Sequence, residues 1–126
     1  MSDNEAVSQA RVPDDVIAAF VFETALSIEG VRGMGLSKSA AALRNNILGR
    51  DKRTRGVRVL YDEDRGYTIE VFLIVSYGAS IPETAWNVQK TVHDGLMSEF
   101  GFEPKDINIH VQGVYKEVAK AENEVS

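Results

Sequence analysis

The residues best suited to acid–base or metal chemistry are the two histidines, His93 and His110. An imidazole changes charge near neutral pH and is the commonest metal ligand in proteins. Neither histidine has an Asp, Glu or His at a recognised metal-binding spacing. His110 alternates with Ile109 in an expected strand, and a half-exposed polar position explains it. The sequence therefore predicts no metal, no cofactor and no catalytic histidine.

Other chemistry-bearing residues also lack catalytic spacing. The chain has no cysteine, which excludes thiolate nucleophiles, disulfides and cysteine-based zinc sites. It contains no Gly-x-Ser-x-Gly motif, no Gly-x-x-x-x-Gly-Lys phosphate loop and no Gly-x-Gly-x-x-Gly fingerprint. The prominent acidic residues fall in an expected turn or at expected helix starts, where negative charge is favoured: Asp62, Glu63, Asp64, Asp14, Asp15 and Glu83. We predict a non-enzymatic protein; an enzyme would need an enclosed polar pocket around His93 or His110, or a buried carboxylate pair to which no motif points.

Positive charge is concentrated between Arg44 and Arg58, where six basic residues stand against Asp51 alone in a chain of formal net charge −5. Its basic members include four candidate partner-binding residues: Arg50, Lys52, Arg53 and Arg55. The segment is either a solvated loop or a docking surface for an anionic partner. Because the whole chain is acidic, general attraction to nucleic acid or anionic lipid is not expected.

A second possible nucleic-acid feature is the run from Gly30 to Gly33, spelled Gly-Val-Arg-Gly. A Gly-x-x-Gly turn between two helices clamps single-stranded nucleic acid in K-homology domains. Gly30 is equally explained as the left-handed residue that ends a helix. Binding of single-stranded nucleic acid through Gly30–Gly33 and Arg50–Arg58 is thus the alternative function.

Exposed apolar side chains are expected on two elements. Trp86, near Gln89 or Lys90, His93 and Met97 at helical spacing, occupies a flank beside the core stripe of its helix. Tryptophan and methionine on such a flank suit a partner interface, and burial at the edge of the core is the alternative. Phe72 and Ile74 lie on the strand face opposite the core residues. We include Phe72, Ile74, Trp86 and Met97 among the candidate partner-binding residues.

The elements that carry these residues follow from periodicity. A helix over 14–29 is expected from the apolar spacing after Pro13, and a second from Ser37 to Leu48. Alternation predicts a hairpin of strands 57–61 and 67–77 and a last strand over 107–111. The clearest helix start is at Ser80, with Pro82 in the first turn and Glu83 completing a capping box. This helix ends at Gly101, which Pro104 follows.

The resulting order is helix, helix, strand, strand, helix, strand. It predicts an α+β fold, a two-layer sandwich in which helices pack on a three-stranded mixed sheet. The third helix serves as the crossover between the long strand and the last one. We expect one domain over residues 13–114, a disordered tail over 1–12 and a charged tail over 115–126. The N-terminus lacks a secretory signal and no window is apolar enough to span a membrane, so a cytoplasmic protein is expected.

The segment Tyr67–Gln89 resembles the alkaline shock protein (envelope stress response) family of bacteria. The family shows a hydrophobic strand, Tyr-Gly, a Ser-Ile-Pro-Glu-like helix start and Asn-Val-Gln within the helix, all present here in order. Further likeness lies in the Gly30-Val31 pair, in Leu48-Gly49-Arg50 before Gly56-Val57-Arg58-Val59, and in Ile107–Val114, so that it covers roughly residues 14–114.

This resemblance implies a cytoplasmic protein of cell-envelope homeostasis or of the alkaline and envelope stress response. Some members are held near the membrane by a membrane-anchored partner. It implies a scaffold that self-associates into a homo-oligomer or docks to such a partner at the membrane periphery. No catalytic residue is carried over from the family.

Overall fold

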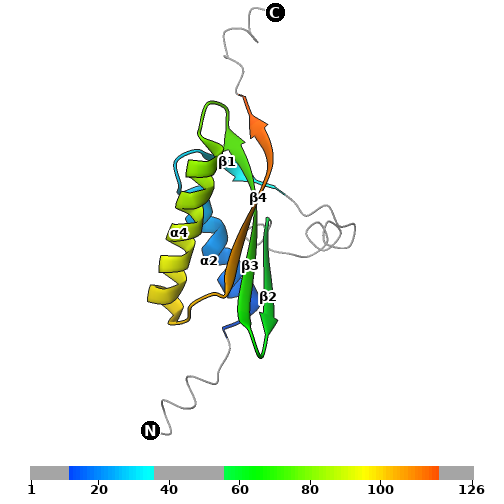
Figure 1. Cartoon of the computed structure of the whole chain (residues 1–126), viewed down its shortest axis with the longest axis vertical. Coiled ribbons are helices and arrows are strands. Elements are labelled where there is room, and N and C mark those ends of the chain that lie inside the picture. Colours follow the sequence, from blue (N-terminus) through cyan, green and yellow to red (C-terminus); the bar gives the residue numbers. More distant parts are fainter. Residues whose placement is uncertain (1–11, 36–55, 117–126) are drawn as a thin grey trace, which may run out of the picture.

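The computed structural model describes residues 12–35 and 56–116. Two helices lie on one face of a four-stranded mixed sheet, which makes a two-layer α+β fold (Figure 1). The helices are α2 (Asp14–Leu26) and α4 (Ile81–Phe100), and the strands are β1 (Val31–Met34), β2 (Val57–Asp62), β3 (Gly66–Ser76) and β4 (Asp106–Tyr115).

The sheet is organised around its longest strand, β3. β2 pairs antiparallel with the first half of β3, and β1 pairs antiparallel with the second half. β4 runs parallel to β3 along nearly its whole length, from Thr68 opposite Asp106 to Ser76 opposite Tyr115. Because β4 takes one edge of β3 throughout, β1 and β2 must lie end to end along the other edge. The parallel pair requires a crossover, and α4 supplies it.

Local chemistry sets both ends of α4. The Ser80 side chain accepts a hydrogen bond from the backbone N–H of Glu83 at 3.3 Å, and proline stands in the first turn. At the other end Gly101 adopts φ 77°, a left-handed conformation that glycine reaches without steric cost. The helix therefore begins and ends where the sequence predicts.

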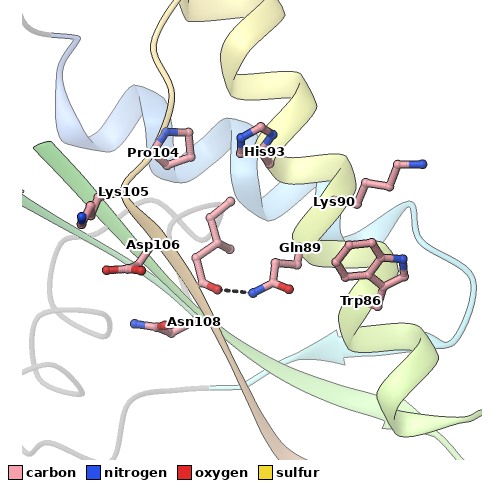
Figure 2. Close-up of a pocket in the computed structure, with 9 residues that line it drawn as sticks. Trp86, Gln89, Lys90, His93, Pro104, Lys105, Asp106 and Asn108 are labelled. Carbon is pink, nitrogen blue, oxygen red and sulfur yellow. Dashed lines mark hydrogen bonds between the residues drawn. The ribbon is translucent and has the colours of Figure 1, made fainter.

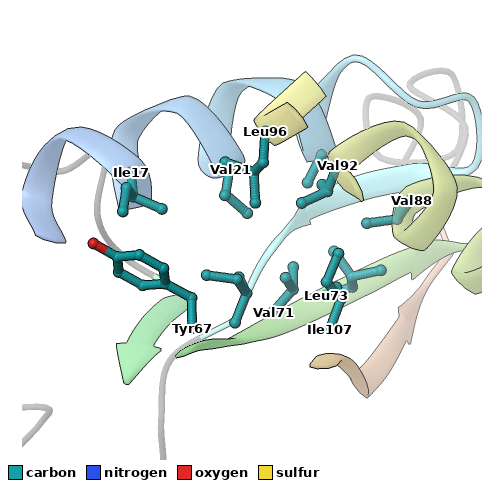
Figure 3. Close-up of a cluster of buried hydrophobic side chains, with 11 residues drawn as sticks. Ile17, Val21, Tyr67, Val71, Leu73, Val88, Val92, Leu96 and Ile107 are labelled. Atoms are coloured by element: carbon teal, nitrogen blue, oxygen red, sulfur yellow. The ribbon is translucent and has the colours of Figure 1, made fainter. Parts of the chain in front are cut away.

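The core lies between β3 and the two helices (Figure 3). The alternate β3 residues facing the helices are buried, and four of them have no exposed surface: Ile69, Val71, Leu73 and Val75. The first three of these meet one apolar stripe from each helix, formed by Ile17, Val21 and Ala25 of α2 and by Val88, Val92 and Leu96 of α4. Burying each such side chain contributes roughly 1.5–3 kcal/mol.

The predicted α+β sandwich, the β2–β3 hairpin and the α4 crossover are confirmed, but the sheet has a fourth strand that was not predicted. Val31–Met34 forms β1, so Gly30–Gly33 is not a turn between two helices. Gly30 has the expected left-handed φ of 101°, whereas Gly33 pairs with Ile74 inside the sheet. The predicted helix from Ser37 to Leu48 lies outside the described residues.

Several boundaries also differ from the predicted ones. α2 ends at Leu26 rather than at residue 29, because Ser27 already turns the chain and donates its hydroxyl to the Thr24 carbonyl. β4 continues past residue 111 to Tyr115 by pairing with the end of β3. β3 ends at Ser76, so Tyr77, predicted as the last residue of the long strand, lies outside it and is 66% exposed.

Candidate functional site

A groove of about 380 Å³ runs between α4 and the start of β4 (Figure 2). One wall comes from α4 and the other from the segment that leads into β4. The residues that line it are Trp86, Gln89, Lys90, His93, Pro104, Lys105, Asp106, Ile107 and Asn108. Because four of these come from one helix flank, they are held in place by the packing of the opposite flank of α4 against the core.

One hydrogen bond ties the two walls together. The Gln89 amide nitrogen donates to the backbone carbonyl of Ile107 at 2.7 Å. Ile107 itself is buried under α4, whereas Trp86 at the mouth of the groove is 59% exposed. The two walls of the groove are therefore held together by this hydrogen bond, and the groove also presents a large indole ring that is not part of the hydrophobic core.

His93 links α4 to the chain that follows it. Its Nδ1 lies 3.2 Å from the Asp94 carboxylate and its Nε2 lies 3.2 Å from the Glu103 carboxylate. These two hydrogen bonds, that to Asp94 first, raise the pKa of His93 above its ordinary value of 6.5 because both favour the imidazolium. Because both ring nitrogens are hydrogen-bonded, His93 connects α4 to the loop that follows it rather than serving as a free base.

The sheet face opposite the helices carries a second group of interacting side chains. Arg58 donates to the Glu70 carboxylate at 2.9 Å, and His110 Nε2 lies 3.9 Å from the same oxygen. The Phe72 and His110 rings stack with centroids 4.7 Å apart and planes 15° apart. Phe72 and Ile74 are half-buried on this face. Among the described residues, this group is a layer of neighbouring strand side chains that no other element encloses.

The structure brings together only some of the predicted partner-binding residues. Trp86 shares the groove with Gln89, Lys90 and His93, as their helical spacing predicts, and burial at the core edge does not apply to it. Met97 is 46% exposed on the same helix but does not line the groove. Phe72 and Ile74 lie on the other face of the sheet. The basic residues lie outside the described residues: Arg50, Lys52, Arg53 and Arg55.

The strand wall of the groove was missed by sequence reasoning. In the sequence, Pro104 marks only that the preceding helix has ended, and nothing indicates that Lys105 or Asn108 would face Trp86. Their place opposite Trp86 depends on how β4 pairs with β3, for which no local sequence signal exists. Gly101 gives the one hint, since its left-handed turn sends the chain back along α4.

Neither metal binding nor membrane spanning has support within residues 12–35 and 56–116. No group of three or more His, Asp or Glu side chains there is placed to hold a metal ion. None of the helices described is long and apolar enough to cross a bilayer.

Comparison with known proteins identifies the family of this chain. The model of the alkaline shock protein 23 family, described as having a cell envelope-related function, matches residues 2–116. The chain belongs to the alkaline shock protein family. It is 35% identical over 107 residues to Spy1614 of Streptococcus pyogenes serotype M6, covering 82% of this chain and 85% of that protein. It is 32% identical over 106 residues to YloU of Bacillus subtilis, covering 84% and 88%.

A more distant relative is YqhY of Bacillus subtilis, 27% identical over 108 residues that cover 86% of this chain and 78% of that protein. No solved structure gives a significant match. The sequence-based family prediction is therefore confirmed, and with it a cell envelope-related function. Neither the family description nor these relatives' names state a reaction.

Proposed function

We propose that this alkaline shock family protein is a non-enzymatic interaction protein of cell-envelope homeostasis. It acts by self-association or by docking to a partner held at the membrane, and it is cytoplasmic and recruited to the membrane periphery by that partner. The observation that supports this most is Trp86, 59% exposed at the mouth of the α4–β4 groove.

Exposure of Trp86 is informative because folding does not need it there. The core stripe of α4 is complete without the indole, since Val88, Val92 and Leu96 are fully buried. Tryptophan is enriched at the centres of protein interfaces, where it is among the residues whose truncation costs most binding energy. An exposed tryptophan beside a groove whose walls are joined by a hydrogen bond therefore favours a role in contact with another protein.

The nucleic-acid alternative loses one of its two supports. It needed a Gly-x-x-Gly turn between helices, and the structure places Gly33 within β1. The enzyme alternative needed an enclosed polar pocket around His93 or His110. The groove beside His93 is open and both nitrogens of that imidazole face carboxylates, and His110 does not line the groove and has a 45% exposed side chain. We therefore carry neither alternative forward.

Two measurements test the proposal on the full chain. Light scattering across micromolar concentrations reports self-association, and co-sedimentation with everted membrane vesicles from the parent cells reports docking. Protease-treated vesicles should lose the protein if its anchor is a protein. Trp86→Ala should weaken whichever association is seen, by about tenfold or more for a central contact.

The matched control for Trp86→Ala is Tyr77→Ala, which removes a comparably exposed ring away from the groove. Phe72→Ser tests the opposite sheet face in the same assays. A strict monomer that also fails to co-sediment with untreated vesicles would contradict the proposed function.

A further inference from the structure

Within residues 12–35 and 56–116, one long edge of the sheet has no strand beside it. β4 is the outermost strand on its side of β3, and no described residue pairs with its outer edge. Proteins usually protect such an edge with lysine, proline or inward-pointing charge. β4 contains neither lysine nor proline, and Asp106 is its only formally charged residue. The edge is therefore chemically open to another extended backbone.

The regular half of this edge is the half that lies beside the groove. The register of β4 against β3 shifts after Val111, where Gln112 is the extra residue, and a bulge of this kind disturbs strand addition. From Asp106 to Val111 the register is unbroken. Asp106, Ile107 and Asn108 of this half also line the groove. A strand added here would thus run directly under the Trp86 flank of α4.

The groove and the free edge of β4 together fit a ligand with an extended backbone. Successive side chains of an extended peptide point to opposite sides, so alternate residues would enter the groove while the others face outward. Trp86 supplies apolar surface at the mouth, as seen in Figure 2. A helix beside a free strand edge is the arrangement that binds extended peptides by strand addition, with backbone bonds giving affinity and pockets giving specificity.

The charge of the groove indicates the chemistry of the peptide. Lys90 on the helix and Lys105 on the strand side both line it, and Asp106 is its only carboxylate. Among the described residues, neither lysine has an ion-pair partner. The Asp94 and Glu103 carboxylates near the groove are already hydrogen-bonded to His93. The two lysines therefore leave unpaired positive charge in the groove of a chain whose net charge is −5, which favours an acidic segment over a neutral or basic one.

We propose that the α4–β4 groove binds an extended, acidic peptide segment of a partner protein, which adds as a strand to the outer edge of β4 at Asp106–Val111. The inference rests on the proposed function in requiring a protein partner. It adds the binding surface, the backbone conformation of the ligand and the sign of its charge.

The probe is a phage-displayed library of random twelve-residue peptides, selected on the full chain. Trp86 is the only tryptophan, so its fluorescence reports occupancy of the groove directly. We expect enriched peptides to carry Asp or Glu, to shift the Trp86 emission and to slow amide hydrogen exchange in β4 between residues 106 and 111. N-methylation of alternate peptide nitrogens should weaken binding about tenfold in one register and little in the other.

Variants separate the groove from the rest of the surface. Lys90→Glu should abolish binding of the acidic peptides, and Trp86→Ala should weaken it, while Tyr77→Ala should bind as the wild type does. Because Trp86→Ala removes the fluorophore, its binding is followed by anisotropy of a dye-labelled peptide. Thermal unfolding of each variant confirms that it is folded.

Three results would overturn the proposal. The first is that no peptide is enriched, and the second is that enriched peptides bind equally well after N-methylation and leave amide hydrogen exchange in β4 unchanged. The third is that amide exchange in β4 slows with rising protein concentration in the absence of peptide, which would make a second copy of the chain the occupant. Self-association and vesicle co-sedimentation are measured separately. If they persist when no peptide binds, the proposed function stands and the strand-addition inference fails.

Discussion

Replacing Gly30 by alanine should strongly destabilise the protein, for two separable reasons. Gly30 has φ 101°, and a Cβ there would lie 2.6 Å from Oγ1 and 3.2 Å from Cγ2 of Thr84. A left-handed conformation costs a non-glycine residue about 1–2 kcal/mol. Overpacking against a buried side chain adds about 1–3 kcal/mol, and Thr84 is only 4% exposed. We expect Gly30→Ala to lower the free energy of unfolding by about 2–5 kcal/mol.

Two other glycines isolate these contributions. Gly78 has φ 93° with nothing within 4 Å of an added Cβ, so Gly78→Ala should cost only the conformational part, about 1–2 kcal/mol. Gly33 has no left-handed φ and open space, so Gly33→Ala should change stability by no more than about 0.5 kcal/mol.

Urea unfolding followed by circular dichroism gives the three free energies, and thermal midpoints should fall by about 4–8 °C per kcal/mol. Adding Thr84→Ala should reduce the cost of Gly30→Ala to that of Gly78→Ala. Equal costs for Gly30→Ala and Gly78→Ala in the wild-type background would refute the steric argument. A large and equal loss at Gly30 and Gly33 would refute the assignment of Gly33 to a tolerant strand position.

Two further predictions concern α4. Ser80→Ala removes the side-chain oxygen that accepts from the Glu83 N–H, and it should lower the free energy of unfolding by about 1 kcal/mol. The control is Ser98→Ala, which removes only a hydroxyl bonded to the Gly95 carbonyl within the helix and should cost less than about 0.5 kcal/mol. Equal losses in urea unfolding would contradict the capping role of Ser80. For His93, the pKa raised by Asp94 and Glu103 means that the folded protein binds a proton more tightly. The resulting stability is fully present below the unfolded pKa of about 6.5 and is lost as pH rises through the folded pKa. The difference in free energy of unfolding between wild type and His93→Gln should therefore be larger at about pH 6 than at about pH 9. A difference that does not change with pH would exclude a stabilising role for the hydrogen bonds of the His93 imidazolium.

Local patterns predicted the elements whose own residues determine them. The alternation along β3 marked the buried set correctly from Tyr67 to Val75, because one face of that strand meets both helices. The Ser80 cap and the Gly101 terminus fixed α4 because both act within one helical turn. These signals need no knowledge of the rest of the fold.

β1 could not be predicted in this way. Val31–Met34 is four residues long and includes Gly33, so neither length nor composition favours a strand. Its structure comes from pairing with Leu73–Val75, about forty positions further along the chain. The groove has the same origin: helical spacing predicts that Trp86, Gln89 and His93 share a flank, but the bonds from Gln89 to Ile107 and from His93 to Glu103 arise only once β4 has paired.

The arrangement of β1 and β2 makes a last prediction, about residues 36–55. The backbone of Phe72 makes two hydrogen bonds of 2.7 Å. Its carbonyl accepts from the Gly35 N–H, and its N–H donates to the Gly56 carbonyl. A Cβ placed on Gly56 would lie only 2.6 Å from the Gly35 carbonyl oxygen. The chain therefore leaves the sheet edge at Gly35 and returns to it at Gly56 beside the same residue.

A linker of about four Gly and Ser residues can bridge such closely spaced ends. Replacing residues 36–55 by this linker should leave the α4–β4 groove and the Trp86 emission unchanged, and should raise the free energy of unfolding by about 1 kcal/mol because the closed loop is shorter. The same deletion removes Arg50, Lys52, Arg53 and Arg55 together. If the shortened chain is folded and still binds acidic peptides and vesicles, the basic run is not the docking surface. A loss of several kcal/mol would instead show that the segment contributes packing to the domain, and would refute the view that the sheet is complete without it.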